Sequence, residues 1–109
     1  MSDDYGFRQV PPDEVKKLLD EGYELIDVRE DWEWQRGHIP GAKHLVLGAL
    51  LANPRGHPLP DKVVFQCAVG ERSAVASEMA VALGVKDVVN LKGGIKAWKD
   101  AGLPMEKPE

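Results

Sequence analysis

The stretch "VVFQCAVGERSAVASEMA", residues 63–80, predicts a strand, a turn and a helix in direct succession. The apolar run that ends at Gln66 is typical of a strand covered on both faces, and the alanine-rich segment at about 73–83 is typical of a helix. Between them lies Cys67, the only cysteine of the chain. A strand that leads through a turn into a helix indicates an α/β sheet. Cys67 would then lie at the carboxyl end of a parallel strand, where such sheets place their ligand sites.

The rest of the chain alternates in the same way. "PPDEVKKLLDEG", residues 11–22, begins with prolines and acids and ends in glycine, which is typical of a short helix. Segment 53–62 is proline-rich and polar and predicts a surface loop. This alternation favours a parallel sheet with right-handed crossovers. The predicted strands are 23–28, 44–47, 62–66 and 87–91, and the other predicted helices are about 31–36, 48–52 and 95–101.

Length and composition exclude several classes of protein. A chain of 109 residues with 43% apolar and 29% charged residues is ordinary for one globular domain. The longest apolar run, 45–52, is far shorter than the roughly 18 residues that span a bilayer, and no export signal precedes it. The net charge is −4, without the basic cluster of a nucleic-acid binder. With a single cysteine, which suits a reducing compartment, we expect a cytoplasmic protein without nucleic-acid or membrane partners.

The neighbours of Cys67 are those that a reactive thiolate needs. Backbone N–H groups of the turn and the positive end of the helix dipole stabilise an anion, and Arg72 adds a cation. Gly70 permits a positive φ in the turn, and Ser73 suits the N-cap of the helix. The alternative is an inert buried cysteine, which needs no such neighbours. We therefore expect Cys67 to be a nucleophile.

Three motifs resemble the single-domain rhodaneses. "CAVGERS" (67–73) is similar to the active-site loop of that family, "DVREDWEWQRGHIPGA" (27–42) to its upstream signature, and "LKGGIKAWKDAGLP" (91–104) to its C-terminal signature. The resemblance implies a three-layer α/β sandwich with helices on both faces of a parallel five-stranded sheet. It also implies one rhodanese domain over 1–109, with its core at about 8–103 and a short polar tail at 104–109.

The resemblance further implies a thiosulfate sulfurtransferase in which Cys67 carries a persulfide. A small anionic sulfur donor would bind in the loop, and the sulfur would pass to cyanide or a thiol. With no second cysteine, the acceptor must come from outside the chain, as an external thiol, cyanide or a sulfur-relay protein. Glu71 departs from the neutral or basic residue expected there, and its charge should repel thiosulfate. The predicted substrate-binding residues are Ala68, Val69, Gly70, Glu71, Arg72 and Ser73.

Three other functions compete with this one. Cysteine-based phosphatases and arsenate reductases also use a thiolate with an arginine at a helix start. Tyrosine phosphatases have a loop with five residues between cysteine and arginine, whereas four, Ala68 to Glu71, intervene here. A non-catalytic interaction module is a second alternative. A thiol redox protein is a third, although it usually has the C-x-x-C motif that this chain lacks.

Other candidate residues favour structural roles. Asp27 and Arg29 fit an ion pair, and Trp98 fits the core. The spacings of the three histidines, His38, His44 and His57, match no metal motif, so neither a metal nor another cofactor is expected. His38 is not expected to be catalytic. For Trp32 and Trp34, packing and a place at the site entrance remain open alternatives.

Overall fold

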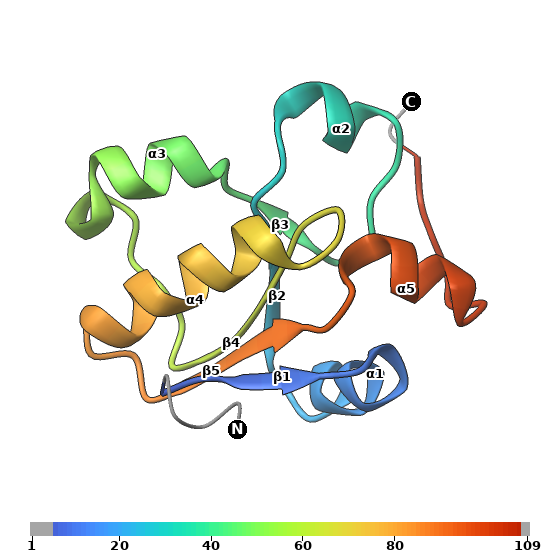
Figure 1. Cartoon of the computed structure of the whole chain (residues 1–109), viewed down its shortest axis with the longest axis horizontal. Helices are drawn as coiled ribbons and strands as arrows, with labels where there is room; N and C mark the ends of the chain where they lie inside the picture. The colour runs from blue at the N-terminus through green and yellow to red at the C-terminus, as the bar shows by residue number, and fades with distance from the viewer. Residues whose placement is uncertain (1–5, 108–109) are drawn as a thin grey trace.

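The computed structural model describes residues 6–107, and its centre is a sheet of five parallel strands (Figure 1). The strand order is β1-β5-β4-β2-β3, so β4 lies in the middle with a partner on each side. The strands are β1 (Arg8–Val10), β2 (Glu24–Asp27), β3 (Lys43–His44), β4 (Lys62–Gln66) and β5 (Asp87–Leu91). Because all strands are parallel, their carboxyl ends meet at one edge of the sheet.

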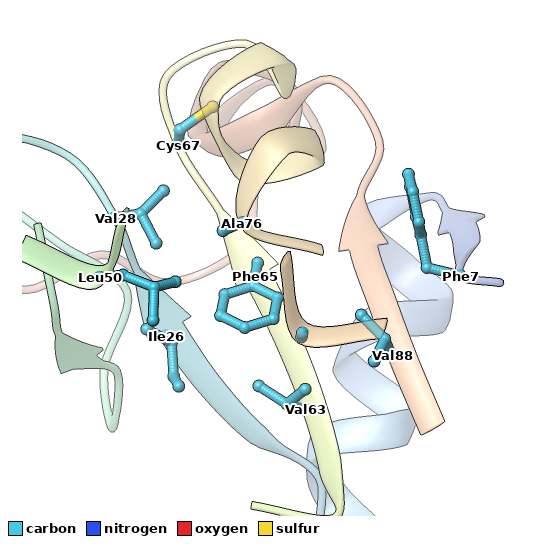
Figure 2. Close-up of a cluster of buried hydrophobic side chains, with 10 residues drawn as sticks. Phe7, Ile26, Val28, Leu50, Val63, Phe65, Cys67, Ala76 and Val88 are labelled. Carbon is cyan, nitrogen blue, oxygen red and sulfur yellow. The ribbon is translucent and has the colours of Figure 1, made fainter. Parts of the chain in front are cut away.

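Helices cover both faces of the sheet, which confirms the predicted three-layer α/β sandwich. On one face, Val63 and Phe65 of β4 pack in a cluster with residues of α3 and α4 (Figure 2). On the other face, Val64 packs with residues of α1 and α5. This alternation explains why β4 is apolar throughout. The helices are α1 (Pro12–Asp20), α2 (Asp31–Gln35), α3 (Leu47–Ala52), α4 (Glu71–Ala82) and α5 (Gly94–Asp100), with a 3-10 turn η2 (Pro54–Gly56) in the proline-rich loop.

The carboxyl edge of the sheet is where α2 and the turns before α4 and α5 gather (Figure 1). Three segments distant in the sequence meet there: the connection after β2, the turn between β4 and α4, and the turn between β5 and α5. This edge is therefore the place where side chains from different parts of the chain can form a site.

Two predicted boundaries are wrong. The strand expected at 44–47 is only Lys43–His44, and α3 already begins at Leu47. Beyond His44, the backbone N–H of Leu45 still donates to the carbonyl of Asp27 at 2.9 Å, but the strand stops because the chain turns into α3 at Leu47. The helix expected at 73–83 begins two residues earlier, at Glu71, after Gly70 with a φ of +100°. Ser73 is therefore not the N-cap but lies in the first turn of α4.

The ends of the described chain are tied to the body. The strand β1, which the residue pattern did not indicate, pairs with β5 at the edge of the sheet. Within the segment 104–107, assigned to a polar tail, the backbone of Glu106 exchanges hydrogen bonds of 2.7 and 2.8 Å with His38. Among residues 6–107, no helix has both the length and the apolar character that crossing a membrane requires.

Candidate active site

Cys67 follows β4 directly, so it lies at the carboxyl edge of the sheet as predicted. Its Sγ receives hydrogen bonds from the backbone N–H of Gly70 at 3.1 Å, the backbone N–H of Ser73 at 3.3 Å and the hydroxyl of Ser73 at 3.3 Å. Figure 2 shows the sulfur directed toward the turn that leads into α4. Convergent donors at a helix start are the setting that stabilises a thiolate. A cysteine that only filled space would not need them.

The loop after Cys67 leads into the helix in such a way that two of the predicted binding residues, Gly70 and Ser73, contact the sulfur. It consists of Ala68, Val69 and Gly70, and the helix begins at the next residue. Val69 and Glu71 are exposed, while Ser73 and Cys67 are buried, with Cys67 only 1% exposed. The sulfur therefore lies at the base of the loop, and the exposed residues form its outer rim.

The glycine pair at the start of α5, Gly93 and Gly94, fixes this loop from behind. The backbone N–H of Ile95 donates to the carbonyl of Cys67 at 2.8 Å, and that of Lys96 donates to the carbonyl of Ala68 at 3.1 Å. Gly94 has a φ of +63°, and a Cβ there would lie 2.5 Å from the Ala68 carbonyl oxygen. Gly94 was not among the residues predicted to shape the site. Two adjacent glycines one residue after a strand were the signal that a close backbone approach was required.

Arg72 does not stand free beside the sulfur, in contrast to the expectation. Its guanidinium forms a two-pronged ion pair with Glu33 of α2, with Nη1–Oε1 at 2.7 Å and Nη2–Oε2 at 2.9 Å. These hydrogen bonds lower the pKa of Glu33 from about 4.5 to about 2, although partial burial acts in the opposite direction. They also raise the pKa of Arg72, to which the nearby charge of Cys67 contributes. Glu33 could not be recognised from local sequence, because its partner Arg72 is 39 residues away.

We expect the Glu33–Arg72 pair to make the protein sensitive to acid. The folded-state pKa of Glu33 is below its ordinary value, so the stabilisation is complete above about pH 4.5 and is lost as the pH falls toward 2. Allowing for the solvent that reaches Arg72, we expect a loss of about 2 kcal/mol in the free energy of unfolding. Urea unfolding between pH 6 and pH 2.5 measures it. Glu33→Gln should lack this part of the decline, and parallel curves for the two proteins would contradict the assignment.

The upstream motif has the structural role expected for Asp27 and Arg29. The two side chains form a buried ion pair, with Arg29 Nη2 at 2.8 Å from Asp27 Oδ2. The same nitrogen donates to the carbonyl of Gly37 at 2.7 Å, which ties the segment after α2 to the end of β2. The predicted ion pair is thus confirmed, and through Gly37 it connects the segment after α2 to the end of β2.

The tryptophans separate into core and surface. Trp98 is 1% exposed and belongs to the core, as predicted. Trp34 of α2 stacks between His38 and His44. Its ring centroid lies 3.6 Å from that of His38 and 4.7 Å from that of His44, so its role is to pack α2 against β3. Trp32 is 60% exposed, with the guanidinium of Arg36 5.1 Å from its ring centroid. In the part of the chain that the structure describes, no cluster of three or more histidine, cysteine, aspartate or glutamate residues is arranged to hold a metal ion.

The hydroxyl of Ser73 should contribute directly to the reactivity of Cys67. A hydrogen bond to a charged acceptor contributes about 1.5 kcal/mol, so Ser73→Ala should slow alkylation of Cys67 by iodoacetamide at pH 7 about tenfold. Ser77→Ala is the matched control, because Ser77 is also buried on α4 but donates to the carbonyl of Ser73 instead of to the sulfur. Equal alkylation rates in the parent and Ser73→Ala would show that the hydroxyl does not stabilise the thiolate.

Comparisons with known proteins agree with this geometry. Residues 11–101 match the family of rhodanese-like domains. Thiosulfate sulfurtransferase GlpE of Pseudomonas fluorescens is 32% identical over 93 residues, which cover 85% of each chain. A rhodanese-related protein of Thermoplasma volcanium superposes with a TM-score of 0.83 at 27% identity, over 94% of this chain and all of that one.

A further solved structure, a protein of Rhodopseudomonas palustris described as a possible tyrosine phosphatase, has a TM-score of 0.80 at 33% identity. It covers 94% of this chain and 87% of its own. The family match spans most of the chain, including β4, the cysteine loop and the glycine pair. The chain therefore belongs to the family of rhodanese-like domains.

Proposed function

We propose that the protein is a sulfurtransferase that carries sulfane sulfur as a persulfide on Cys67. The observation that carries this proposal is the set of hydrogen bonds from Gly70 and Ser73 to Sγ. They supply neutral donors to a single sulfur atom, and a thiolate or a persulfide anion needs such donors in a site with little water. The name of the Pseudomonas fluorescens relative, a thiosulfate sulfurtransferase, supports the same chemistry.

The reaction follows from the nucleophilicity of the thiolate. In the first half, Cys67 Sγ attacks the outer sulfur of thiosulfate, the sulfur–sulfur bond of the donor breaks, and sulfite leaves with the electron pair. The product is a persulfide anion on Cys67. In the second half, an acceptor nucleophile attacks the outer sulfur, the bond to Sγ breaks, and the thiolate is restored. Neither half needs an oxidant or a reductant, because the attacking nucleophile supplies the electron pair of the new bond and the leaving group keeps the pair of the broken bond.

The acceptor is an external molecule. The chain has a single cysteine, so no second thiol of its own can attack the persulfide. Cyanide or a low-molecular-weight thiol can serve as the acceptor in an assay, and a thiol of a relay protein could serve in the same role.

A cysteine-based phosphatase is the second candidate, favoured by the likeness to the Rhodopseudomonas palustris protein. The loop argues against it. Only four residues separate Cys67 from Arg72, and the guanidinium that would bind a phosphoryl group is already bound by Glu33. A short loop of this kind suits a sulfur atom better than a tetrahedral phosphate.

Intact mass spectrometry after incubation with thiosulfate separates the functions. A sulfurtransferase should gain the mass of one sulfur atom, located on Cys67, and cyanide should remove it. Turnover of an aryl phosphate without this adduct would favour the phosphatase. If the protein shows neither the sulfur adduct nor turnover of the aryl phosphate, that result would favour a non-catalytic interaction module.

Glu71 provides a test of charge at the rim. It is exposed at the first position of α4, where its carboxylate would repel a thiosulfate dianion. We expect Glu71→Gln to raise kcat/KM for thiosulfate several-fold at low ionic strength. The gain should shrink toward 1 M salt, where the screening length is about 3 Å. Kinetics that match the parent at every salt concentration would show that this carboxylate does not face the donor.

A further inference from the structure

We propose that Glu33 is a specificity-determining residue, which makes the Cys67 site discriminate against anionic reagents by occupying the guanidinium of Arg72. The inference rests on the proposed sulfur transfer for its consequence, namely that donors with less negative charge than thiosulfate are preferred. The charge effect itself depends only on a reactive thiol at Cys67.

The guanidinium of Arg72 and the carboxylate of Glu33 are joined by two hydrogen bonds. Two nitrogens of one guanidinium face two oxygens of one carboxylate, at 2.7 and 2.9 Å. The Glu33 side chain is only 12% exposed, compared with 36% for Arg72. Such a two-pronged pair holds its arginine in one orientation and cancels its charge. Arg72 is thereby prevented from binding a second anion with the same edge of its guanidinium.

Glu33 is itself fixed by the start of α2. Its Oε1 also accepts the backbone N–H of Glu30 at 2.9 Å, in a capping box at the helix N-terminus. The carboxylate therefore cannot turn away from Arg72 without uncapping the helix. The partner of Arg72 is positioned by local structure, independently of any ligand.

The remaining charges near this pair are mostly negative. Glu30 acts on Arg72 as a second acidic neighbour, and Glu71 is exposed at the start of the same helix. Arg29, a cation close enough to act on Glu33, is bound by the fully buried Asp27. The contacts to the sulfur come from neutral groups, two backbone N–H and one hydroxyl. A dianion that approaches Sγ therefore meets carboxylates whose charge is not offset by a free arginine.

Glu33→Gln removes the charge with little change in size. A glutamine retains one oxygen, which can still accept the N–H of Glu30, but its amide nitrogen is a donor and cannot accept from Arg72. The variant therefore keeps the cap and releases one prong of the guanidinium. Glu78→Gln is the matched control, because it removes the same charge from an exposed position of α4 farther along the helix.

The first measurement compares two sulfur donors of the same chemistry and different charge, thiosulfate (a dianion) and methanethiosulfonate (a monoanion). We take a separation of about 7 Å, in nearly bulk water, between the donor and the carboxylate that is removed. Loss of that negative charge should then raise kcat/KM about sevenfold for a dianion and about threefold for a monoanion. We expect Glu33→Gln to raise the thiosulfate-to-methanethiosulfonate ratio about threefold and Glu78→Gln to leave it unchanged. An unchanged ratio in Glu33→Gln overturns the proposal, because a merely structural loss would lower both rates alike.

The second measurement does not depend on sulfur transfer. Iodoacetate is an anion and iodoacetamide is neutral, and both alkylate Cys67 by the same displacement. The ratio of their rate constants should rise about threefold in Glu33→Gln. If the parent transfers no sulfur and this ratio still rises, the proposed function fails and the role of Glu33 in charge discrimination holds. If the ratio stays constant, that role is refuted whatever the parent's activity.

Discussion

Replacing Cys67 with serine is expected to abolish persulfide formation and to lower sulfur transfer by on the order of a thousandfold or more. A serine hydroxyl does not ionise near neutral pH and cannot hold a sulfane sulfur that exchanges with thiols. Thiosulfate:cyanide sulfurtransferase activity and the sulfur adduct in the intact mass should disappear together.

The fold of Cys67→Ser should persist, which makes the loss of activity interpretable. The serine oxygen can accept the same donors from Gly70 and Ser73 that now contact Sγ. We expect the urea unfolding midpoint to change little, and Cys67→Ala to serve as the comparison in which these donors lose their acceptor. Substantial sulfur transfer by a folded Cys67→Ser protein would refute the proposed role of the cysteine.

Replacing Gly94 with alanine is expected to reduce the free energy of unfolding by about 3 kcal/mol and to impair the reactivity of Cys67. The added Cβ would lie 2.5 Å from the carbonyl oxygen of Ala68 and 2.6 Å from that of Cys67. Both are backbone atoms, so relief requires the loop and the start of α5 to separate. Separation would break the hydrogen bonds from Ile95 and Lys96 to these carbonyls. Urea unfolding and iodoacetamide alkylation measure the two effects.

Gly102→Ala is the control for backbone strain alone. Gly102 also has a positive φ, +77°, but a Cβ there would meet no atom within 4 Å. It should cost only about 1 kcal/mol and leave the reactivity of Cys67 unchanged. Equal destabilisation by the two variants would mean that the close approach of Gly94 to the cysteine loop is unimportant.

The sequence by itself determined the elements whose signals are local. The central strand, the turn at Gly70 and the alanine-rich helix follow from apolar periodicity and turn residues within 63–80. The location of Cys67 at the carboxyl edge follows from the same stretch, because a parallel strand that enters a helix must end there. The edge strand β1 has no such local signal. β1 is only three residues long, and its assignment depends on pairing with β5, about 80 residues away.

The tertiary structure alone decided what surrounds the sulfur. Arg72 was predictable as a cation near Cys67, but its binding by Glu33 depends on where α2 packs against the start of α4. The role of Gly94 likewise appears only when the turn after β5 is placed against the cysteine loop. In both cases the partners are well separated in sequence, and no local propensity encodes their distance. Sheet order and packing bring them together, because parallel strands place the turns that follow them at one common edge.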